Sequence, residues 1–280
     1  NPLGLVREAS ESEVRKLVFY SSGSCFFYFE TSTIDVILIG NNINCGDMVT
    51  IMFDKNLIQN PSFARIVADI TCDGHLQLKA WRGLVSFYSN DPRAIKREEE
   101  RFSKLFNVKG HIYYDNRPKN GAYKLFFVSK PLAMFLAEMG VPVGNKTNIS
   151  FTVPEWVIYG KKKIKTAYLR GVYDSEGCIY PTNKEEMNSR WRIGIEMYKN
   201  ENLRENGFYF MNQIRNMLKE MEIASSPIRF KKGNKRKDGT TSIGVVFDIE
   251  RNSFRNFYKN VGFDDPVKLA KLKHCVRGRR

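Results

Sequence analysis

The chain has 280 residues, enough for two domains of about 150, and its 42% hydrophobic and 27% charged residues are ordinary for a globular protein. This composition excludes wholesale disorder and collagen-like repeats. The formal net charge of +15 indicates a polyanionic partner, with nucleic acid favoured over an anionic membrane surface. No apolar run reaches the roughly 18 residues of a spanning helix, and the N-terminus lacks a signal pattern. We therefore expect a soluble, cytoplasmic protein without a membrane partner.

The cysteines and histidines limit the metal and redox chemistry available. The cysteines are odd in number and scattered, without a CxxC pair, at Cys25, Cys45, Cys72, Cys178 and Cys275. This pattern argues against a disulfide framework and against a structural zinc site. Three histidines are too few for histidine-rich nuclease or metalloprotease chemistry.

Residues 1–60 differ from the rest of the chain. Their formal net charge is −3, whereas residues 61–160 carry +5 and residues 161–280 carry +13. Apolar runs at 25–29 and 36–39 lie beside turn signals, which predicts a small β-rich N-terminal extension. An extension that only packs on the rest, without chemistry of its own, is the simpler interpretation.

One pattern occurs twice, with an offset of 103 residues at every matched position: Ala64-x3-Ala68-x4-Asp73-Gly74 and Ala167-x3-Gly171-x4-Glu176-Gly177. Small residues four apart share one helical face, so the two segments are predicted to be helices that pack on each other. The glycine after each acid predicts a left-handed helix end with the carboxylate beside it. The pattern divides the chain into repeats over 61–160 and 161–280.

Two carboxylates at packed helix C-termini are electrostatically unfavourable. The helix ends already carry partial negative charge. At a separation of about 5 Å and an effective dielectric constant of about 20, their repulsion is roughly 3 kcal/mol. A cation between them would offset this cost, and Mg²⁺ prefers few carboxylates plus water. The alternative is that Asp-Gly and Glu-Gly are polar turns; its weight falls because the pattern occurs twice.

Similar elements follow each copy. Polar and apolar residues alternate over 75–80 and 190–198, the period of half-buried strands. Helices are expected over about 92–106 and 202–222, each followed by a hairpin, over 110–130 and 228–249. Each half thus has the order αββαββα, and the fold class is α+β with two pseudo-symmetric repeats. Each sheet has one apolar face and one basic, polar face.

Two further pairs of residues match between the halves. Asn90 and Asn200 fall at the end of the second strand, before a helix. Lys146 and Lys268 lie six residues after a glycine that closes a helix. Simpler interpretations remain open, because asparagine in this position is often a helix cap and lysine is usually a solvated charge.

Over its two motif segments the sequence resembles the LAGLIDADG homing endonucleases. Residues 169–177 (LRGVYDSEG) match the nine-residue motif closely, and residues 66–74 (IVADITCDG) match it with Ala68 for the motif glycine and Thr71 for its first aspartate. The resemblance covers about residues 61–275. Two motifs about a hundred residues apart are typical of single-chain, intron-encoded members, and residues 141–146 resemble the inter-repeat region of archaeal members.

The resemblance implies a monomer whose two antiparallel sheets form a saddle over double-stranded DNA. Asp73 and Glu176 would be the catalytic, metal-binding carboxylates, one for each strand that is cut, with Mg²⁺ as cofactor. Asn90 and Asn200 would organise water, and Lys146 and Lys268 would be basic active-site residues. Members cut both strands across the minor groove and leave short 3′ overhangs.

Metal ions held by carboxylates can activate the water and stabilise the phosphate charge in hydrolysis, and the lysines could add to that stabilisation. The polar faces of the strands would recognise the DNA sequence, because a β-ribbon fits the major groove. The candidate readers, for which phosphate contact is the alternative, are Gln77, Lys79, Arg82, Arg190, Arg192, Arg229 and Lys231. Two other functions stay open: an RNA-binding maturase that helps an intron fold, and a DNA-binding regulator on a decayed nuclease scaffold.

Overall fold

The computed structural model describes residues 15–21, 24–30, 34–38, 50–52, 55–116, 121–183, 190–236 and 239–277, with side chains from residue 56 onward. The N-terminal extension contains four strands: β1 (Arg15–Ser21), β2 (Ser24–Glu30), β3 (Ile34–Leu38) and β4 (Thr50–Met52). They pair in antiparallel fashion in the order β1-β2-β3-β4, which confirms the predicted β-rich character. A short 3₁₀ turn, η1 (Lys55–Gln59), leads into the first repeat.

The first repeat has the predicted αββαββα order. Its elements are α1 (Pro61–Cys72), β5 (His75–Lys79), β6 (Arg82–Ser89), α2 (Pro92–Phe106), β7 (His111–Asp115), β8 (Ala122–Val128) and α3 (Lys130–Glu138). Each helix begins after a capping residue, Asn60, Asp91 or Ser129, whose side chain accepts a backbone N–H of the first turn, and each helix has proline in that turn. The strands form an antiparallel sheet in the order β5-β6-β8-β7.

The second repeat has the same order and the same sheet topology. A linker with the short helix α4 (Glu155–Ile158) leads into it. Its elements are α5 (Lys162–Ser175), β9 (Gly177–Pro181), β10 (Trp191–Asn200), η2 (Glu201–Leu203), α6 (Arg204–Lys219), β11 (Arg229–Lys235), β12 (Thr241–Asp248), η3 (Arg251–Ser253) and α7 (Phe254–Asn260). A further helix, α8 (Pro266–Arg277), follows it. The sheet order β9-β10-β12-β11 repeats that of the first half, so the predicted fold class is confirmed.

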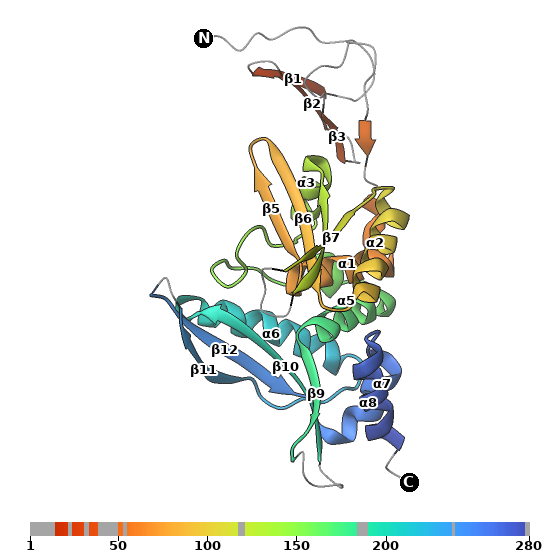
Figure 1. Cartoon of the computed structure of the whole chain (residues 1–280), viewed down its shortest axis with the longest axis vertical. Coiled ribbons are helices and arrows are strands. Elements are labelled where there is room, and N and C mark those ends of the chain that lie inside the picture. Colours follow the sequence, from red (N-terminus) through yellow and green to blue (C-terminus); the bar gives the residue numbers. More distant parts are fainter. Residues whose placement is uncertain are drawn as a thin grey trace.

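The motif helices α1 and α5 lie side by side between the two sheets (Figure 1). Ala64, Ala68 and Gly171 are buried at their contact, as the small-residue stripes predict. A Cβ atom added to Gly171 would lie 2.6 Å from the Cβ of Ala68, so the two backbones could not approach this closely with a larger residue. Alanine in place of the motif glycine in α1 therefore still permits the packing.

The predicted left-handed helix ends at Gly74 and Gly177 are wrong. Both helices end on the acid itself in right-handed conformation, with φ −91° at Asp73 and −89° at Glu176, and neither glycine has a positive φ. Space explains the glycines instead. A Cβ on Gly74 would lie 2.7 Å from the Ile70 Cα, and one on Gly177 would lie 2.4 Å from a backbone carbonyl oxygen. They let the chain turn directly from helix into strand.

Both sheets show the predicted alternation. In β10, Ile193, Ile195 and Met197 are buried, whereas Arg192 and Tyr198 on the other face are exposed. The buried rows contribute to one hydrophobic core that continues through α1 and α5. The opposite faces stay uncovered by helices, which leaves one open face on each sheet. Among the described residues, no helix is long and apolar enough to cross a membrane.

Candidate functional site

The acids Asp73 and Glu176 occupy equivalent positions at the C-terminal ends of α1 and α5. Because these helices pack together, the two repeats bring their carboxylates to one place. Burial, followed by the charge of Asp73, raises the pKa of Glu176 to about 7. Glu176 is half-buried. The electrostatic strain predicted from the sequence is thus present.

The donor set fits a hard divalent cation. Among the described residues, neither carboxylate accepts a hydrogen bond or forms an ion pair, so their oxygens are free to bind a ligand. Mg²⁺ takes few carboxylates, keeps several waters and tolerates an open site. No group of three or more His, Cys, Asp or Glu side chains in the described chain could form a fuller cage. Two carboxylates and water molecules are therefore the ligands that this site could provide to a cation.

Lys146 lies against the end of α1. Its ammonium donates to the carbonyl oxygens of Ile70 (3.0 Å), Cys72 and Gly74 (2.6 Å), which surround Asp73 in the chain. The positive charge offsets the negative end of the helix. Burial lowers the pKa of Lys146, while the charges of Cys72, Glu176 and Asp73 oppose that shift.

Lys268 occupies the matching place on α5. Its ammonium donates to the carbonyl oxygens of Tyr173 (3.3 Å) and Asp174, next to Glu176. Its charge, like that of Lys146, holds the pKa of Glu176 lower than burial alone would set it. The two lysines thus make equivalent contacts in the two repeats, and both lie near the shared acidic centre.

The asparagines are placed differently from the lysines. Asn90 is exposed at the end of β6. The Asn200 side chain accepts the backbone N–H of Asn202 (3.2 Å) and thereby caps η2. No hydrogen bond joins either side chain to Asp73 or Glu176 within the described residues. Their role in organising water stays a prediction.

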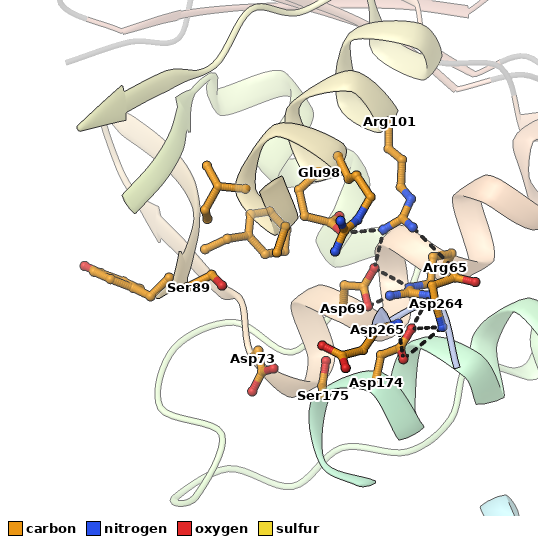
Figure 2. Close-up of a pocket in the computed structure, with 15 residues that line it drawn as sticks. Arg65, Asp69, Asp73, Ser89, Glu98, Arg101, Asp174, Ser175, Asp264 and Asp265 are labelled. Atoms are coloured by element: carbon orange, nitrogen blue, oxygen red, sulfur yellow. Dashed lines mark hydrogen bonds and ion pairs between the residues drawn. The ribbon is translucent and has the colours of Figure 1, made fainter. Parts of the chain in front are cut away.

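An ionic network that the sequence did not reveal lies behind the acids, at the interface of the repeats. Arg65 of α1 contacts Asp69 (2.6 Å), Asp174 of α5 (2.8 Å) and Asp264 before α8 (2.7 Å). Arg101 of α2 joins Asp69 (3.4 Å) and Asp264 (3.3 Å). Figure 2 shows these side chains converging, with Asp73 and Ser175 to one side of them. They line a cavity of about 160 Å³ and tie the two repeats together.

Three predicted base readers lie on the open face of the first sheet. Gln77 and Lys79 alternate with buried Leu76 on β5, and Arg82 pairs with Lys79 across the hairpin. The rest of this face carries an apolar patch around one lysine, made of Leu84, Tyr88, His111, Tyr113, Lys124, Phe126 and Val128. The Lys124 ammonium lies 5.0 Å from the Tyr88 ring centre and 5.8 Å from that of Tyr113.

The second sheet presents a more charged face. Arg192, Arg229 and Lys231 lie on it, and Arg190 is exposed just before β10. Two of these cations have acidic neighbours on the same face: Arg229 contacts Asp248 (2.5 Å) and Lys231 contacts Glu196 (3.0 Å). A nucleic acid that used these side chains would compete with the carboxylates. Whether the predicted readers contact bases stays a prediction.

The raised pKa of Glu176 gives a test of its surroundings without any ligand. Because the folded pKa of about 7 exceeds the ordinary 4.5, the folded state binds the proton more tightly, and stability falls as pH rises between these values. Glu176→Gln removes this cost. In metal-free buffer we expect the variant to be more stable than the unmodified chain by about 1 to 3 kcal/mol at pH 8, with little difference at pH 4.5. Urea unfolding at both pH values measures this, and equal stabilities at pH 8 would contradict it.

Comparison with known proteins finds no matching family model. The chain is 29% identical over 170 residues to the replication factor C small subunit of Methanocaldococcus jannaschii, which is 58% of this chain and 9% of that protein. It is 26% identical over 220 residues to the tRNA-splicing ligase RtcB of Methanopyrus kandleri, and 25% identical over 222 residues to that of Pyrococcus abyssi. These matches cover 74% and 75% of this chain but 21% and 23% of the ligases, so the chain spans at most about a quarter of these relatives.

Solved structures with a similar fold include LAGLIDADG homing endonucleases. Mesophilic variants of the homing endonuclease I-DmoI align with a TM-score of 0.49 and 15% identity, over 78% of this chain and 98% of that one. I-WcaI bound to its DNA recognition sequence aligns with a TM-score of 0.48 and 13% identity, over 77% and 85%. Full-length DUF199/WhiA from Thermatoga maritima aligns with a TM-score of 0.44 and 14% identity, over 85% and 63%. At such scores and identities the likeness carries no information on activity.

Proposed function

We propose that this chain is a divalent-metal-dependent endonuclease that hydrolyses both strands of a long double-stranded DNA site. The observation that carries the proposal is the convergence of Asp73 and Glu176, one from each pseudo-repeat, at the ends of two packed helices. Folding sets the two acids together although the charge of one raises the pKa of the other. Such an arrangement has a use when a cation and a phosphate lie between them.

Asp73 and Glu176 would hold Mg²⁺, which supplies an activated water and stabilises negative charge on the phosphate when it is bound. Because each repeat contributes one carboxylate, each repeat would serve one DNA strand. Lys146 and Lys268 bind backbone carbonyls beside each acid, and they would keep positive charge next to the scissile phosphates. Asn90 and Asn200, at equivalent strand ends in the two repeats, would order the water of this centre.

The open faces of the two sheets would receive the flanking DNA. Gln77, Lys79 and Arg82 lie on one face, and Arg192 and Lys231 lie on the other. The apolar patch of the first sheet suits thymine methyl groups, because major-groove readout uses apolar contacts of this kind. The charged face of the second sheet suits hydrogen bonds to base edges and phosphates. Cutting across the minor groove between them would leave short 3′ overhangs.

The curated relatives bear on the proposal in a limited way. The matching segment forms part of a replication factor subunit and of tRNA-splicing ligases, whose names describe different activities. We infer that the segment is a module independent of its host's activity. Neither a replication role nor RNA ligation therefore belongs to the proposed function of this chain.

Cleavage of DNA of unknown target can be tested without guessing a site. Genomic DNA from a close relative that lacks the coding segment is incubated with the purified chain and Mg²⁺, and new double-strand ends are mapped by sequencing. A recurrent end with a short 3′ overhang that disappears with a chelator supports the nuclease. Binding without new ends would favour the DNA-binding regulator, and selective binding of intron RNA would favour the maturase.

Binding to DNA should weaken steeply with salt. The chain carries a net charge of +15, and each phosphate contact releases condensed counterions. With six or more such contacts, affinity should fall at least a hundredfold between about 50 and 200 mM salt. Fluorescence anisotropy with the mapped site, in Ca²⁺ to prevent turnover, measures the slope. Lys79→Ala should lower the slope by about one, and an affinity independent of salt contradicts the groove model.

A further inference from the structure

Lys199 is a completely buried cation at the end of β10, on the core-facing row of the strand. Its ammonium donates to the backbone carbonyls of Lys146 (2.8 Å) and Ile149 (2.8 Å). It also lies 3.6 Å from the ring centre of Phe151. The contacts of its ammonium are therefore with the segment 146–151, part of the linker that joins the two repeats, while its aliphatic stem lies beside Gly207 of α6. No carboxylate among the described residues balances its charge.

The same linker has other attachments to the second repeat. The backbone N–H of Asn200 donates to the Thr147 carbonyl (2.8 Å), and Arg236 donates to the Thr147 hydroxyl (3.1 Å). The Asn206 side chain accepts the backbone N–H of Phe151 (3.2 Å) and donates to its carbonyl (3.1 Å). Residues 146–151 are thus bound to the second sheet and α6 through their main chain.

The Lys146 side chain leaves the linker in the opposite direction and caps α1 of the first repeat. Two of its acceptors are the carbonyls of Cys72 and Gly74, on either side of Asp73. A continuous chain of hydrogen bonds therefore runs from Lys199 through the main chain of Lys146 to the backbone that carries Asp73. The β10 strand of one repeat is joined in this way to the acid of the other.

The first repeat has no equivalent contact among its described residues. Ser89 holds the place of Lys199, as judged from the matching strand ends at Asn90 and Asn200, and its hydroxyl accepts the backbone N–H of Asp91. Only the Asp73 half of the site is therefore fixed from the opposite repeat in this way. Burial, followed by the charge of Lys146, lowers the pKa of Lys199 to about 7, so this lysine is unfavourable for folding alone.

We propose that Lys199 is a positioning residue that holds the Asp73 half of the site through Lys146. One consequence rests on the proposed function, namely the effect on DNA cutting. Loss of Lys199 slows cutting of the strand served by Asp73 more than cutting of the strand served by Glu176. The coupling of Lys199 to the backbone around Asp73 is independent of any activity.

The first test measures amide hydrogen exchange of the free protein, without DNA or metal, in the variant Lys199→Met. Lys199→Gln serves as a second variant should the first fold poorly. The amides of Asp73 and Gly74 donate to Asp69 and are expected to be protected. Exchange in peptides covering 72–76 should rise about tenfold or more. Lys146→Met should do the same, and the double variant should add nothing further. The matched control is Lys165→Met, which loses a pair with Glu220 away from the site.

Increased exchange confined to 146–151, with 72–76 unchanged, would overturn the proposal, because Lys199 would then hold the linker alone. The second readout is the cutting of supercoiled plasmid that carries the mapped site. Lys199→Met should accumulate nicked circles with the break predominantly in one strand, at unchanged DNA affinity, and equal slowing of both strands would also overturn it. If the unmodified chain cuts no DNA, the proposed function fails, and the exchange result still decides the role of Lys199.

Discussion

Asp73→Asn and Glu176→Gln are each expected to abolish double-strand cutting while the affinity for DNA stays near that of the unmodified chain. Each substitution keeps the shape of the side chain but removes one of the two negative charges that would hold the cation. Because Asp73 is exposed and Glu176 is half-buried, and both lie at helix ends, neither conservative substitution should disturb the fold. The loss should reach about a hundred- to a thousandfold in rate, the scale of removing one preorganised polar group from an active site.

The measurement is the rate of linear product formation from plasmid with the mapped site in Mg²⁺, together with affinity in Ca²⁺. Glu205→Gln, an exposed acid on α6, is the matched control and should cut normally. Residual nicking of one strand by either variant agrees with the assignment, since each acid serves one strand. Cutting of both strands at the unmodified rate by either variant would show that the catalytic acids lie elsewhere.

Affinity in the same variants separates the other two functions. A DNA-binding regulator would bind its site without needing either acid. The unmodified chain and both variants would then bind DNA equally and cut none of it. A maturase would bind intron RNA in preference to duplex DNA, through the same basic surfaces. Thr71 and Ala68, the departures in the first motif, are both buried in α1, and the helix packing persists around them. These departures therefore do not by themselves indicate a decayed site.

The repeat pattern carries most of the information that the sequence holds about the site. Small residues four apart report how closely two helices can approach, and the fold places Ala68 and Gly171 in contact as this rule requires. The expected helix over 92–106 coincides with α2, because Asp91 caps it and Pro92 starts it. The turn chemistry predicted at Gly74 is wrong, since a helix that passes directly into a strand needs space more than it needs a positive φ.

Other features depend on contacts between distant segments, which spacing alone does not encode. Arg65 and Asp264 are 199 residues apart, and the sequence around each gives no sign of the other. Lys199 lies on the core-facing row of β10, where a charged side chain is costly, and its hydrogen bonds to the linker carbonyls account for its burial. Symmetry between the repeats points to Lys146 and Lys268, but their contacts with helix-end carbonyls require the folded chain.

Arg65→Met should destabilise the fold strongly. The Arg65 side chain is 11% exposed, and its guanidinium contacts Asp69, Asp174 and Asp264, which come from both repeats and from the segment before α8. Methionine fills similar space but leaves the two buried acids, Asp69 and Asp174, without this cation. Removing one partner of a buried ionic cluster leaves uncompensated charge and costs about 3 to 5 kcal/mol. The free energy of urea unfolding measures the loss.

Arg93→Met is the control, because Arg93 pairs with Asp91 at an exposed helix start and should change stability little.

The loss in Arg65→Met should also depend on pH. Burial, followed by the charge of Glu98, raises the pKa of Asp69, and Arg65 opposes that shift. Without Arg65 the folded pKa rises further above the ordinary 3.8, so folding becomes more favourable as pH falls and Asp69 takes up a proton. The stability difference between variant and unmodified chain should therefore be smaller at pH 5 than at pH 8. A difference independent of pH would mean that lost packing, and not the uncompensated charge of Asp69, accounts for the effect.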